Sequence, residues 1–577
     1  MRILGNGLEW LDCVAGLAAE RHDVVALDRA AIRRAWAYPR EDWWRAVVPD
    51  GWAPDVALFC SPEYHPVPPL IGALPCPVVL WVGDWYANWQ AVSWIADQAD
   101  LVLADATGVA ALRRARVTDV VDVAECCPWT FDPRVHRPDW DAPAERDVGF
   151  LGNFNEAIQH ERNRWLGRLT RLRPGIRVEL GSGRFGADYV RFVQGSKIAF
   201  NFSLTGDVNM RAFEAPACGA MTLIDAGAAP EAARWFALGR EVVVYDDGNI
   251  EALVEHYLHH DDERRAIARA GWERVQQHGP VQRLDQLLGH LESVARRRRP
   301  LDVARAGGRC AAHALSVRDD EVPESCELLL DPADRIDPSD GAVQVARAAL
   351  YAALAGSGHP QAAEAVGWAD EHLLRAIAAD PGDAVARLSR AQLVSAAGQP
   401  EAGRAMALAL ADDLRAGRAT AQPDRLPIVD TLAWRTRRQV PILSGADPRP
   451  DLSRLTLVAA LRLAATLTAD DLETRAALLA EALDRSGEDP VVRMELAICL
   501  LGLRPAEAVL HSAEVVERLP INVVGWQLHA RALVSAGRPG EARAFVADRL
   551  EVTGRVRVDE GLLEGLHAII APLAATA

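Results

Sequence analysis

The sequence predicts two doubly wound α/β domains followed by an all-helical repeat domain. Short runs rich in Val, Leu and Ile alternate with helical stretches over residues 1–145, and the same rhythm resumes at residue 146. Beyond residue 341 only helical periodicity remains. Apolar runs that alternate with helices are typical of parallel sheets with crossover helices. The 577 residues exceed one core, and about 150 residues per domain predicts three or four domains.

The strands of the first domain, residues 1–145, are predicted in six runs bounded by polar or turn residues. These runs read MRIL, DVVALD, DVALFC, PVVLWVGD, LVLAD and VVDVAE. A second domain, residues 146–299, is predicted from DVGFLGN, IRVELG, KIAFNFS, MTLID and EVVVYD. A helix from about Pro280 to Arg299 is expected to close it.

Residues 300–340 lose periodicity and gain Gly, Asp and Pro, which predicts a linker. Residues 341–577 are rich in Ala and Leu and contain an internal echo, ARLSRAQLVSAAGQPEAGRA and LHARALVSAGRPGEARA. Helix pairs of about 30 to 34 residues with a glycine at the turn resemble tetratricopeptide repeats. Such repeats stack into a curved array whose concave surface commonly binds protein.

Charge and cysteine content narrow the classes of function. The net charge of −17 argues against broad binding to nucleic acid or an anionic membrane. Nine cysteines form no CxxC pair and no cluster at zinc spacing, so no structural zinc site is expected. The start of the chain lacks the pattern of a signal peptide, and no run of about 18 apolar residues occurs. We therefore expect a cytoplasmic protein without a membrane span.

The most informative stretch is NMRAFEAPACGAMTLIDAG, from Asn209 to Gly227. A polar loop runs into a short helix that carries Glu214, and Gly219 ends that helix. A helix N-terminus presents unpaired N–H groups, so the loop at Gly206 to Asn209 suits a diphosphate. Glu214, about one turn further, would then face the sugar attached to it.

These residues carry a resemblance. NMRAFEAPACG, the preceding KIAFNFS and the later EVVVYDD and ALVEHYLHHDDERRAIARAGWERV resemble the C-terminal half of bacterial glycosyltransferases of the spore-maturation type, related to group 1 transferases with the GT-B fold. The resemblance covers roughly residues 1–295. It implies that Glu214 binds the nucleotide ribose and that the site lies between the two α/β domains. Related retaining enzymes carry another Glu eight residues earlier, where this chain has Gly206.

Further donor-binding candidates surround the first turn of the second domain, GNFNEAIQHERNRW. Arg162 and Arg164 are expected to pair with the donor phosphates, and Gly152 with Asn153 lets backbone approach the ligand. The alternative is an ordinary exposed helix start. Arg211 lies one turn before Glu214, and Asn209 is expected to cap that helix.

Catalytic candidates in the first domain follow its predicted strands, where doubly wound sheets present reactive groups. Glu63 and His65 follow DVALFCSP, and Asp84 follows VVLWVG. An inverting enzyme needs a base for the acceptor hydroxyl, and any of the three suits that role. In a retaining enzyme the leaving phosphate can take the proton, and each residue is then a structural cap. Trp85 and Trp89 suit either acceptor contact or core packing.

The sequence thus predicts a metal-independent GT-B glycosyltransferase that uses a nucleotide-sugar as substrate and needs no cofactor. The absence of a DxD-type motif at a strand end of the second domain favours charge stabilisation by Arg and helix N–H groups. The repeats suggest a protein acceptor such as flagellin or a surface protein. The alternatives are a surface-polysaccharide glycosyltransferase and a non-catalytic scaffold whose transferase half has decayed, as Gly206 suggests.

Overall fold

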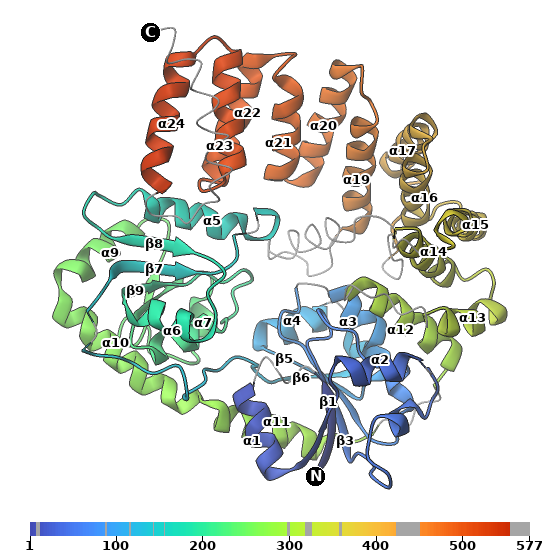
Figure 1. The fold of residues 1–577 in the computed structure, drawn as a ribbon, viewed down its shortest axis with the longest axis horizontal. Helices are drawn as coiled ribbons and strands as arrows, with labels where there is room; N and C mark the ends of the chain where they lie inside the picture. Colours follow the sequence, from blue (N-terminus) through green and yellow to red (C-terminus); the bar gives the residue numbers. More distant parts are fainter. Residues whose placement is uncertain are drawn as a thin grey trace. The chain divides into compact units, whose positions relative to one another are not determined.

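A computed structural model describes all of the chain except residues 7–11, 38, 87–88, 115–116, 142, 155, 297–300, 318–325, 357–359, 423–450 and 554–577. Its elements follow the predicted order of two α/β domains and then helices (Figure 1). The chain forms two compact units, Met1–Pro128 with Pro280–Leu467, and Trp129–Gly279 with the residues from Thr468 onward.

The first sheet has six parallel strands in the order β2-β1-β3-β4-β5-β6. Its strands are β1 (Arg2–Asn6), β2 (Asp23–Ala26), β3 (Val56–Cys60), β4 (Val78–Trp81), β5 (Leu101–Ala104) and β6 (Asp122–Glu125). Helices α1 (Asp12–Arg21), α2 (Arg29–Ala37), α3 (Trp89–Ile95) and α4 (Ala106–Arg114) alternate with them, joined by short 3-10 turns. The central strands β3, β4 and β5 are buried along their length, which explains their unbroken apolar runs.

The second sheet has five parallel strands in the order β11-β10-β9-β7-β8. They are β7 (Arg146–Leu151), β8 (Val178–Gly181), β9 (Ser196–Phe200), β10 (Met221–Asp225) and β11 (Val243–Tyr245). The intervening helices are α5 (Glu156–Thr170), α6 (Gly186–Gln194), α7 (Arg211–Ala217), α8 (Ala229–Ala232), α9 (Ile250–His259) and α10 (Asp261–Val275). Both sheets therefore have the doubly wound character that the sequence predicts.

Helix α11 (Pro280–Ser293) corrects one expectation, because it packs on the first sheet rather than closing the second. Its leucines Leu284, Leu287 and Leu291 lie in one core cluster with Ile3 and Val14. An ion pair of 2.7 Å joins Arg21 of α1 to Asp285. Periodicity alone shows that a helix has an apolar face, but it does not show which sheet buries that face.

The stretch 300–340 is not the irregular linker that the composition predicts, because its described part contains α12 (Val303–Val317) and α13 (Cys326–Ile336). Helix α12 is buried and packs against α3 of the first domain. At Gly307 an added Cβ would lie 3.3 Å from Leu329, so the small residue permits close helix packing. Glycine and alanine in this stretch serve helix contacts rather than chain freedom.

The remaining helices form antiparallel pairs in which Asp or Asn begins many helices. They are α14 (Gly341–Ala355), α15 (Ala362–Ala379), α16 (Ala384–Ala396), α17 (Pro400–Arg415), α19 (Leu452–Thr466), α20 (Leu472–Ser486), α21 (Pro490–Leu500), α22 (Pro505–Arg518), α23 (Val523–Ser535) and α24 (Pro539–Thr553). Side chains cap the N-termini at Asp340, Asp383, Asp451, Asp471, Asp489 and Asn522. The two echoed sequences form the matching pairs α16–α17 and α23–α24. Gly398 and Gly537 adopt positive φ at their turns.

The last helices share a core with the second sheet. Helix α5 packs against α21 and α22 (Figure 1), and Trp526 lies buried in one cluster with Trp165 and Leu166 of α5. At Gly167 an added Cβ would lie only 2.0 Å from Pro520, so the two segments meet without room for a side chain. These helices therefore cover an apolar face of the second domain.

Candidate functional site

A buried carboxyl group lies at the carboxyl edge of the first sheet, in the turn after β3. Glu63 is 2 % exposed, and its Oε1 accepts the backbone N–H groups of Gly83 and Asp84 at 2.9 and 2.8 Å. Its Oε2 has no hydrogen-bond partner among the described residues. Burial, together with the neighbouring Asp84, raises the pKa of Glu63 to about 8. Glu63 is therefore predominantly protonated at neutral pH.

Asp84 follows β4 and is half-buried beside Glu63. The hydroxyl of Tyr64 donates to its Oδ2 at 2.7 Å, and the hydroxyl of Tyr86 donates to its Oδ1 at 3.1 Å. Because β3 and β4 are adjacent parallel strands, their carboxyl ends bring these residues together. His65 belongs to the same turn, where its backbone N–H donates to Ser61 at 3.1 Å. The three predicted catalytic residues thus lie on one edge.

Of the two tryptophans singled out after Asp84, the structure describes the side chain of one. Trp85 is 6 % exposed and packs in the core of the first domain, edge-on to Tyr86, so the core-packing alternative holds for it. The side chain of Trp89 lies outside the described residues.

Two arginines gather over one aromatic ring at the carboxyl edge of the second sheet. The guanidinium groups of Arg162 and Arg211 lie 5.2 and 4.5 Å from the ring centre of Phe150. Arg162 donates to the carbonyl of Asn153, and Arg211 donates to the carbonyl of Leu151. Backbone carbonyls and a ring face orient both cations. Two guanidinium groups held close together suit an anion.

Gly152 and Asn153 continue from β7 beneath these cations. An added Cβ at Gly152 would lie 2.7 Å from the Phe150 ring and 2.9 Å from Nη2 of Arg211. Only glycine therefore leaves the guanidinium where it is. Asn153 is exposed and contributes its carbonyl to Arg162.

Glu214 lies on α7, with its side chain 14 % exposed. Burial raises its pKa, against the opposing effects of His136, Tyr189 and Arg211. Nδ1 of His136 accepts the backbone N–H of Asp132 at 2.9 Å, so the imidazole proton lies on Nε2. That Nε2 faces Glu214 Oε1 at 3.6 Å. The carboxyl group is thus oriented but keeps capacity to accept further hydrogen bonds.

Hydrogen bonds within the loop and to the end of β10 hold the polar loop before α7. Ser203 donates its hydroxyl to Asp207, and its backbone N–H donates to Asp225 at the end of β10 at 2.9 Å. Burial raises the pKa of Asp225 to about 6. Asn209 does not cap α7 as expected: its amide donates to the carbonyl of Phe202 at 3.1 Å, and the N-cap is Met210 without a side-chain cap.

The short helix α7 is ended as the sequence predicts. It has only seven residues, contains Pro216 and stops at Gly219, whose φ is +83°. A helix this short contributes a small dipole, so the arginine side chains supply most of the positive charge at this edge.

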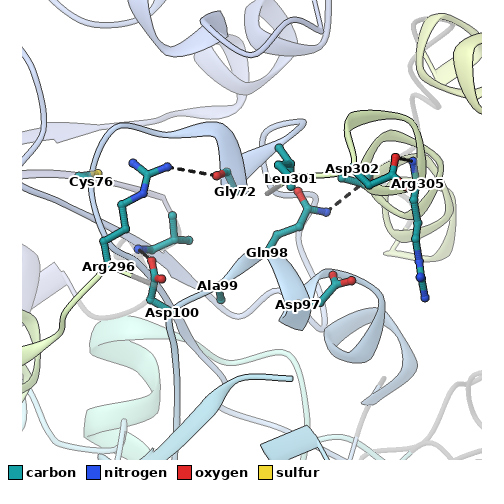
Figure 2. A pocket seen from close by; sticks show the side chains of 12 residues that line it. Gly72, Cys76, Asp97, Gln98, Ala99, Asp100, Arg296, Leu301, Asp302 and Arg305 are labelled. Carbon is teal, nitrogen blue, oxygen red and sulfur yellow. Dashed lines mark hydrogen bonds between the residues drawn. The ribbon is translucent and has the colours of Figure 1, made fainter. Parts of the chain in front are cut away.

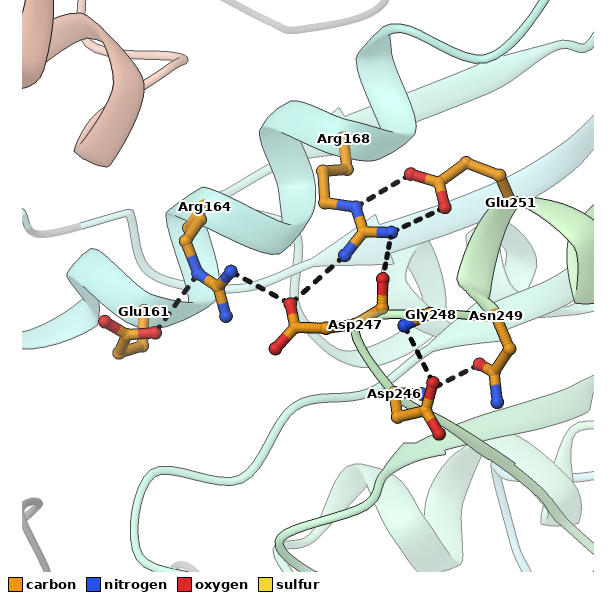
Figure 3. Close-up of polar contacts among 8 residues, drawn as sticks. All are labelled: Glu161, Arg164, Arg168, Asp246, Asp247, Gly248, Asn249 and Glu251. Atoms are coloured by element: carbon orange, nitrogen blue, oxygen red, sulfur yellow. Dashed lines mark hydrogen bonds and ion pairs between the residues drawn. The ribbon is translucent and has the colours of Figure 1, made fainter.

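Arg164 corrects the expectation that it joins Arg162 as a phosphate partner. It forms ion pairs with Asp247 at 2.9 Å and Glu161 at 3.3 Å (Figure 3). Arg168 joins the same network through Asp247 and Glu251. These arginines are matched with carboxylates on an exposed surface, as the alternative of an ordinary helix start implies.

A pocket of about 260 Å³ lies at the opposite, amino-terminal edge of the first sheet (Figure 2). Its lining groups bond mainly to the protein: Asp100 accepts the N–H of Val78 at 2.8 Å, and Gln98 donates to the carbonyl of Ala306 at 3.4 Å. The pocket contains none of the predicted site residues. The candidate functional site is therefore assigned to the carboxyl edges and not to this pocket.

Sequence reasoning missed three residues of the second edge, His136, Tyr189 and Asn201. Nη1 of Arg211 donates to Oδ1 of Asn201 at 3.2 Å. Asn201 directly follows a strand, a signal that could have found it. His136 and Tyr189 come from outside the motif by tertiary folding, and no local pattern marks them.

Three findings concern metal ions, disulfides and membrane spans. Among the described residues, no group of three or more His, Cys, Asp or Glu side chains is placed to hold a metal ion. The eight cysteines whose side chains are described are buried and form no disulfide. In the same part of the chain, each helix is too short or too polar to cross a membrane.

Comparison with known proteins bears on the second domain. Residues 148–289 match a protein family described as glycosyl transferase-like, and this range includes Phe150, Arg162, Arg211 and Glu214. No curated protein sequence matches the chain. The residues that gather at the second edge therefore lie within the part of the chain that is similar to this family.

Solved structures give weaker likenesses. A sucrose-phosphate synthase from Thermosynechococcus elongatus is 12 % identical with a TM-score of 0.38, covering 51 % of this chain and 98 % of that one. TarM is 9 % identical with a TM-score of 0.30, covering 41 % and 55 %. Human IFIT1 is 13 % identical with a TM-score of 0.27, covering 52 % and 67 %. These scores are too low for further inference.

Proposed function

We propose that the protein is a GT-B glycosyltransferase of the spore-maturation, group 1-like type that takes its sugar from a nucleoside diphosphate. The observation that carries this proposal is the pair Arg162 and Arg211 over Phe150, in the part of the chain that matches the glycosyl transferase-like family and also contains Glu214. Two oriented guanidinium groups suit a diphosphate. A carboxyl group with free acceptor capacity suits the hydroxyls of a ribose.

The chemistry of the leaving group fits this division of roles. As the bond to the sugar breaks, negative charge grows on the diphosphate, and fixed cations stabilise that charge without reorganising. We infer that no metal ion is needed, because Arg162 and Arg211 place two guanidinium groups over the ring of Phe150. Asp84, Glu63 and His65 stay the candidate bases for the acceptor hydroxyl.

We propose a protein acceptor, such as flagellin or another surface protein, recruited by the tetratricopeptide-like helices. The repeated pairs α16–α17 and α23–α24 support a stacked array with a surface for a polypeptide. A surface polysaccharide is the alternative acceptor, because the half-exposed Tyr64 beside Asp84 offers an aromatic face to a sugar ring. The unpaired cysteines suit a reducing, cytoplasmic setting.

One observation favours the rival, a scaffold without activity. Gly206 has a φ of +77°, and an added Cβ would lie 3.0 Å from the carbonyl of Gly227. A glutamate at this position would be strained, so this loop is built for glycine. A scaffold would keep its helices and bind no nucleotide.

Calorimetry separates the two functions. Titration with UDP, GDP, ADP and the matching nucleoside monophosphates should show binding of one diphosphate, and the corresponding nucleotide-sugar should be slowly hydrolysed or transferred. Both activities should persist in EDTA. Binding of none of these nucleotides would favour the scaffold, and loss of turnover in EDTA with recovery in Mn²⁺ would contradict metal independence.

A further inference from the structure

We propose that His136 and Tyr189 are positioning residues for Glu214, which hold its carboxyl group ionised and aimed at the hydroxyls of a ribose. These roles rest on the proposed use of a nucleoside diphosphate, and they name the residues on which recognition of its ribose depends. His136 lies before the range 148–289 that matches the glycosyl transferase-like family, so that match assigns it no role. All three residues lie in the second compact unit.

The segment that carries His136 is fastened to the second domain at two points. The side-chain amide of Gln194 on α6 donates to the carbonyl of Arg137 at 2.7 Å. At the end of α7, an added Cβ on Gly219 would lie 2.8 Å from Pro138, so the two segments meet without room for a side chain. Helices α6 and α7, which carry the other two residues of the proposal, therefore both contact this segment.

A hydrogen-bonded turn fixes the ring of His136 and the position of its proton. The backbone N–H of His136 donates to the carbonyl of Asp132 at 2.7 Å, and the backbone N–H of Asp132 donates to Nδ1 of the ring at 2.9 Å. Arg134 forms an ion pair of 2.6 Å with the carboxylate of Asp132 in the same turn. Because Nδ1 accepts, the proton lies on Nε2, which is 3.6 Å from Oε1 of Glu214. The turn thus aims an N–H donor at the carboxyl group.

Tyr189 approaches the same carboxyl group from α6. Its ring packs edge-on to that of His136, with the ring centres 6.2 Å apart. The Tyr189 hydroxyl and the Glu214 carboxyl group lie close enough for each to shift the pKa of the other. However, the hydroxyl is buried and has no hydrogen-bond partner among the described residues. Since a buried hydroxyl without a partner costs free energy, this site gains when the carboxyl group or a ligand hydroxyl comes within reach.

The groups around Glu214 decide whether its carboxyl group is ionised. Burial raises its pKa, whereas His136, Tyr189 and Arg211 each lower it. The other titratable neighbour is Cys218 at the end of α7, where burial raises the pKa of the thiol and keeps it uncharged. An ionised carboxylate only accepts hydrogen bonds, which suits ribose hydroxyls that donate them. The two positioning residues therefore favour the form of Glu214 that binds a ribose.

Discrimination between two nucleotides tests these roles by calorimetry on the full chain. The probes are the diphosphate that binds among UDP, GDP and ADP, and the 2′,3′-dideoxy form of the same nucleotide. The natural protein should bind the ribose form about 10- to 100-fold more tightly, the usual value of hydrogen bonds to a charged group. Tyr189→Phe and His136→Phe should each lower this ratio by about 3- to 10-fold, without weakening binding of the dideoxy form. An unchanged ratio in either variant would reject that residue as a positioning residue.

Matched variants separate positioning from general damage to the domain. Tyr257→Phe makes the same substitution on α9 in the core of this domain and should keep the ratio. Tyr189→Phe itself should not lower the thermal stability, because the hydroxyl that it removes has no hydrogen-bond partner. His136→Gln keeps a side-chain N–H donor and should retain a larger ratio than His136→Phe. Equal ratios for these two His136 variants would contradict the role of the ring N–H.

The pH dependence of the same ratio distinguishes an ionised Glu214 from simple packing. As pH falls, Glu214 takes up a proton and the ratio should decline, whereas titration of the diphosphate affects both probes alike. Without the N–H of His136 the pKa of Glu214 rises further, so the decline in His136→Phe should begin at a higher pH than in the natural protein. Glu214→Gln should show a small ratio at every pH. Coincident pH profiles for His136→Phe and the natural protein would overturn the proposal.

Unfolding without nucleotide tests the ionisation of Glu214 by itself. Because its pKa is raised on folding, the native state binds the extra proton, and stability falls as pH rises above the ordinary value of 4.5. Measured against the matching Glu214→Gln protein, this fall should extend to a higher pH in His136→Phe than in the natural protein. Binding of no nucleotide would reject the ribose role together with the proposed function. Nucleotide binding with the same pH dependence of stability in both proteins would reject only the positioning by His136.

Discussion

The two parallel sheets carry different side chains at their carboxyl edges. At the first edge Glu63 and Asp84 lie together among tyrosine hydroxyls. At the second edge Arg162 and Arg211 lie over Phe150. The topology is of the same kind in both domains, so the difference comes from the side chains on the turns and helices at each edge.

This contrast shows how one architecture can carry different chemistry at its strand ends. Oriented guanidinium groups suit an anion, whereas a buried carboxyl group with a raised pKa can hold a proton. The edges are also supported by different helices. Helices α11 and α12 pack with the first domain, whereas α5 and the last helices of the chain share a core with the second sheet.

The largest effect should come from Trp526, which links the last helices to the second domain. It is fully buried, and its indole N–H donates to Pro520 at 3.0 Å. Trp526→Ala should lower the free energy of unfolding by about 3 to 5 kcal/mol. Thermal unfolding followed with and without the bound nucleotide measures the loss. If the last helices were a separate module, the nucleotide would raise the thermal stability of Trp526→Ala and of the natural protein by the same amount. The statement that these helices support the second domain would then be wrong.

Charge at the second edge can be tested with two arginines on one helix. Arg162→Met should weaken binding of the nucleoside diphosphate by about 10- to 100-fold, the usual value of one charge-assisted hydrogen bond. Arg164→Met, which removes an exposed and already paired cation, should change it by less than about threefold. Calorimetry with the uncharged nucleoside should show little difference between the variants. Equal effects of the two substitutions would mean that the edge is not selectively cationic.

Asp225 should make the stability of the folded protein fall as pH rises, which is opposite to the effect of a salt-bridged acid. Its pKa of about 6 in the folded protein exceeds the ordinary value of 3.8, so the native state binds the extra proton between these values. Stability should therefore fall by up to about 1.4 kcal/mol per unit as pH rises from 4 to 6, and then level off. Asp225→Asn should lack this slope, apart from a constant offset for a lost hydrogen bond. Unfolding curves from pH 4 to 8 measure it.

A smaller effect on diphosphate affinity is expected at Gly152, whose backbone lies against the guanidinium group of Arg211. Gly152→Ala should push the Arg211 guanidinium from its position and weaken diphosphate binding by about 1 kcal/mol, roughly fivefold. Gly289→Ala on α11, where an added Cβ meets nothing within 4 Å, is the control and should leave affinity unchanged. Identical affinities for both variants would show that the cation is free to move.

Much of the fold could be predicted because strand runs and turns are local signals. The residues that follow β3, β4 and β7 could be chosen as candidates for the same reason, since parallel strands end at one edge. Arg164 was misjudged because its partner Asp247 lies 83 residues away along the chain. The placement of α11 and α12 depends on which sheet buries an apolar face, which no local pattern contains.

Each unit consists of two separate segments of the chain, so the order of synthesis decides when each core can be completed. The chain passes from one unit to the other after Pro128, after Gly279 and after Leu467, so neither unit is encoded by one continuous stretch. On the ribosome the first sheet is made early, but its core is complete only after α11 and α12, which follow the entire second sheet. The core of the second sheet is complete only after the last helices are made. Fragments made by a single cut, or halves exchanged between related genes at one junction, would each carry an unfinished core.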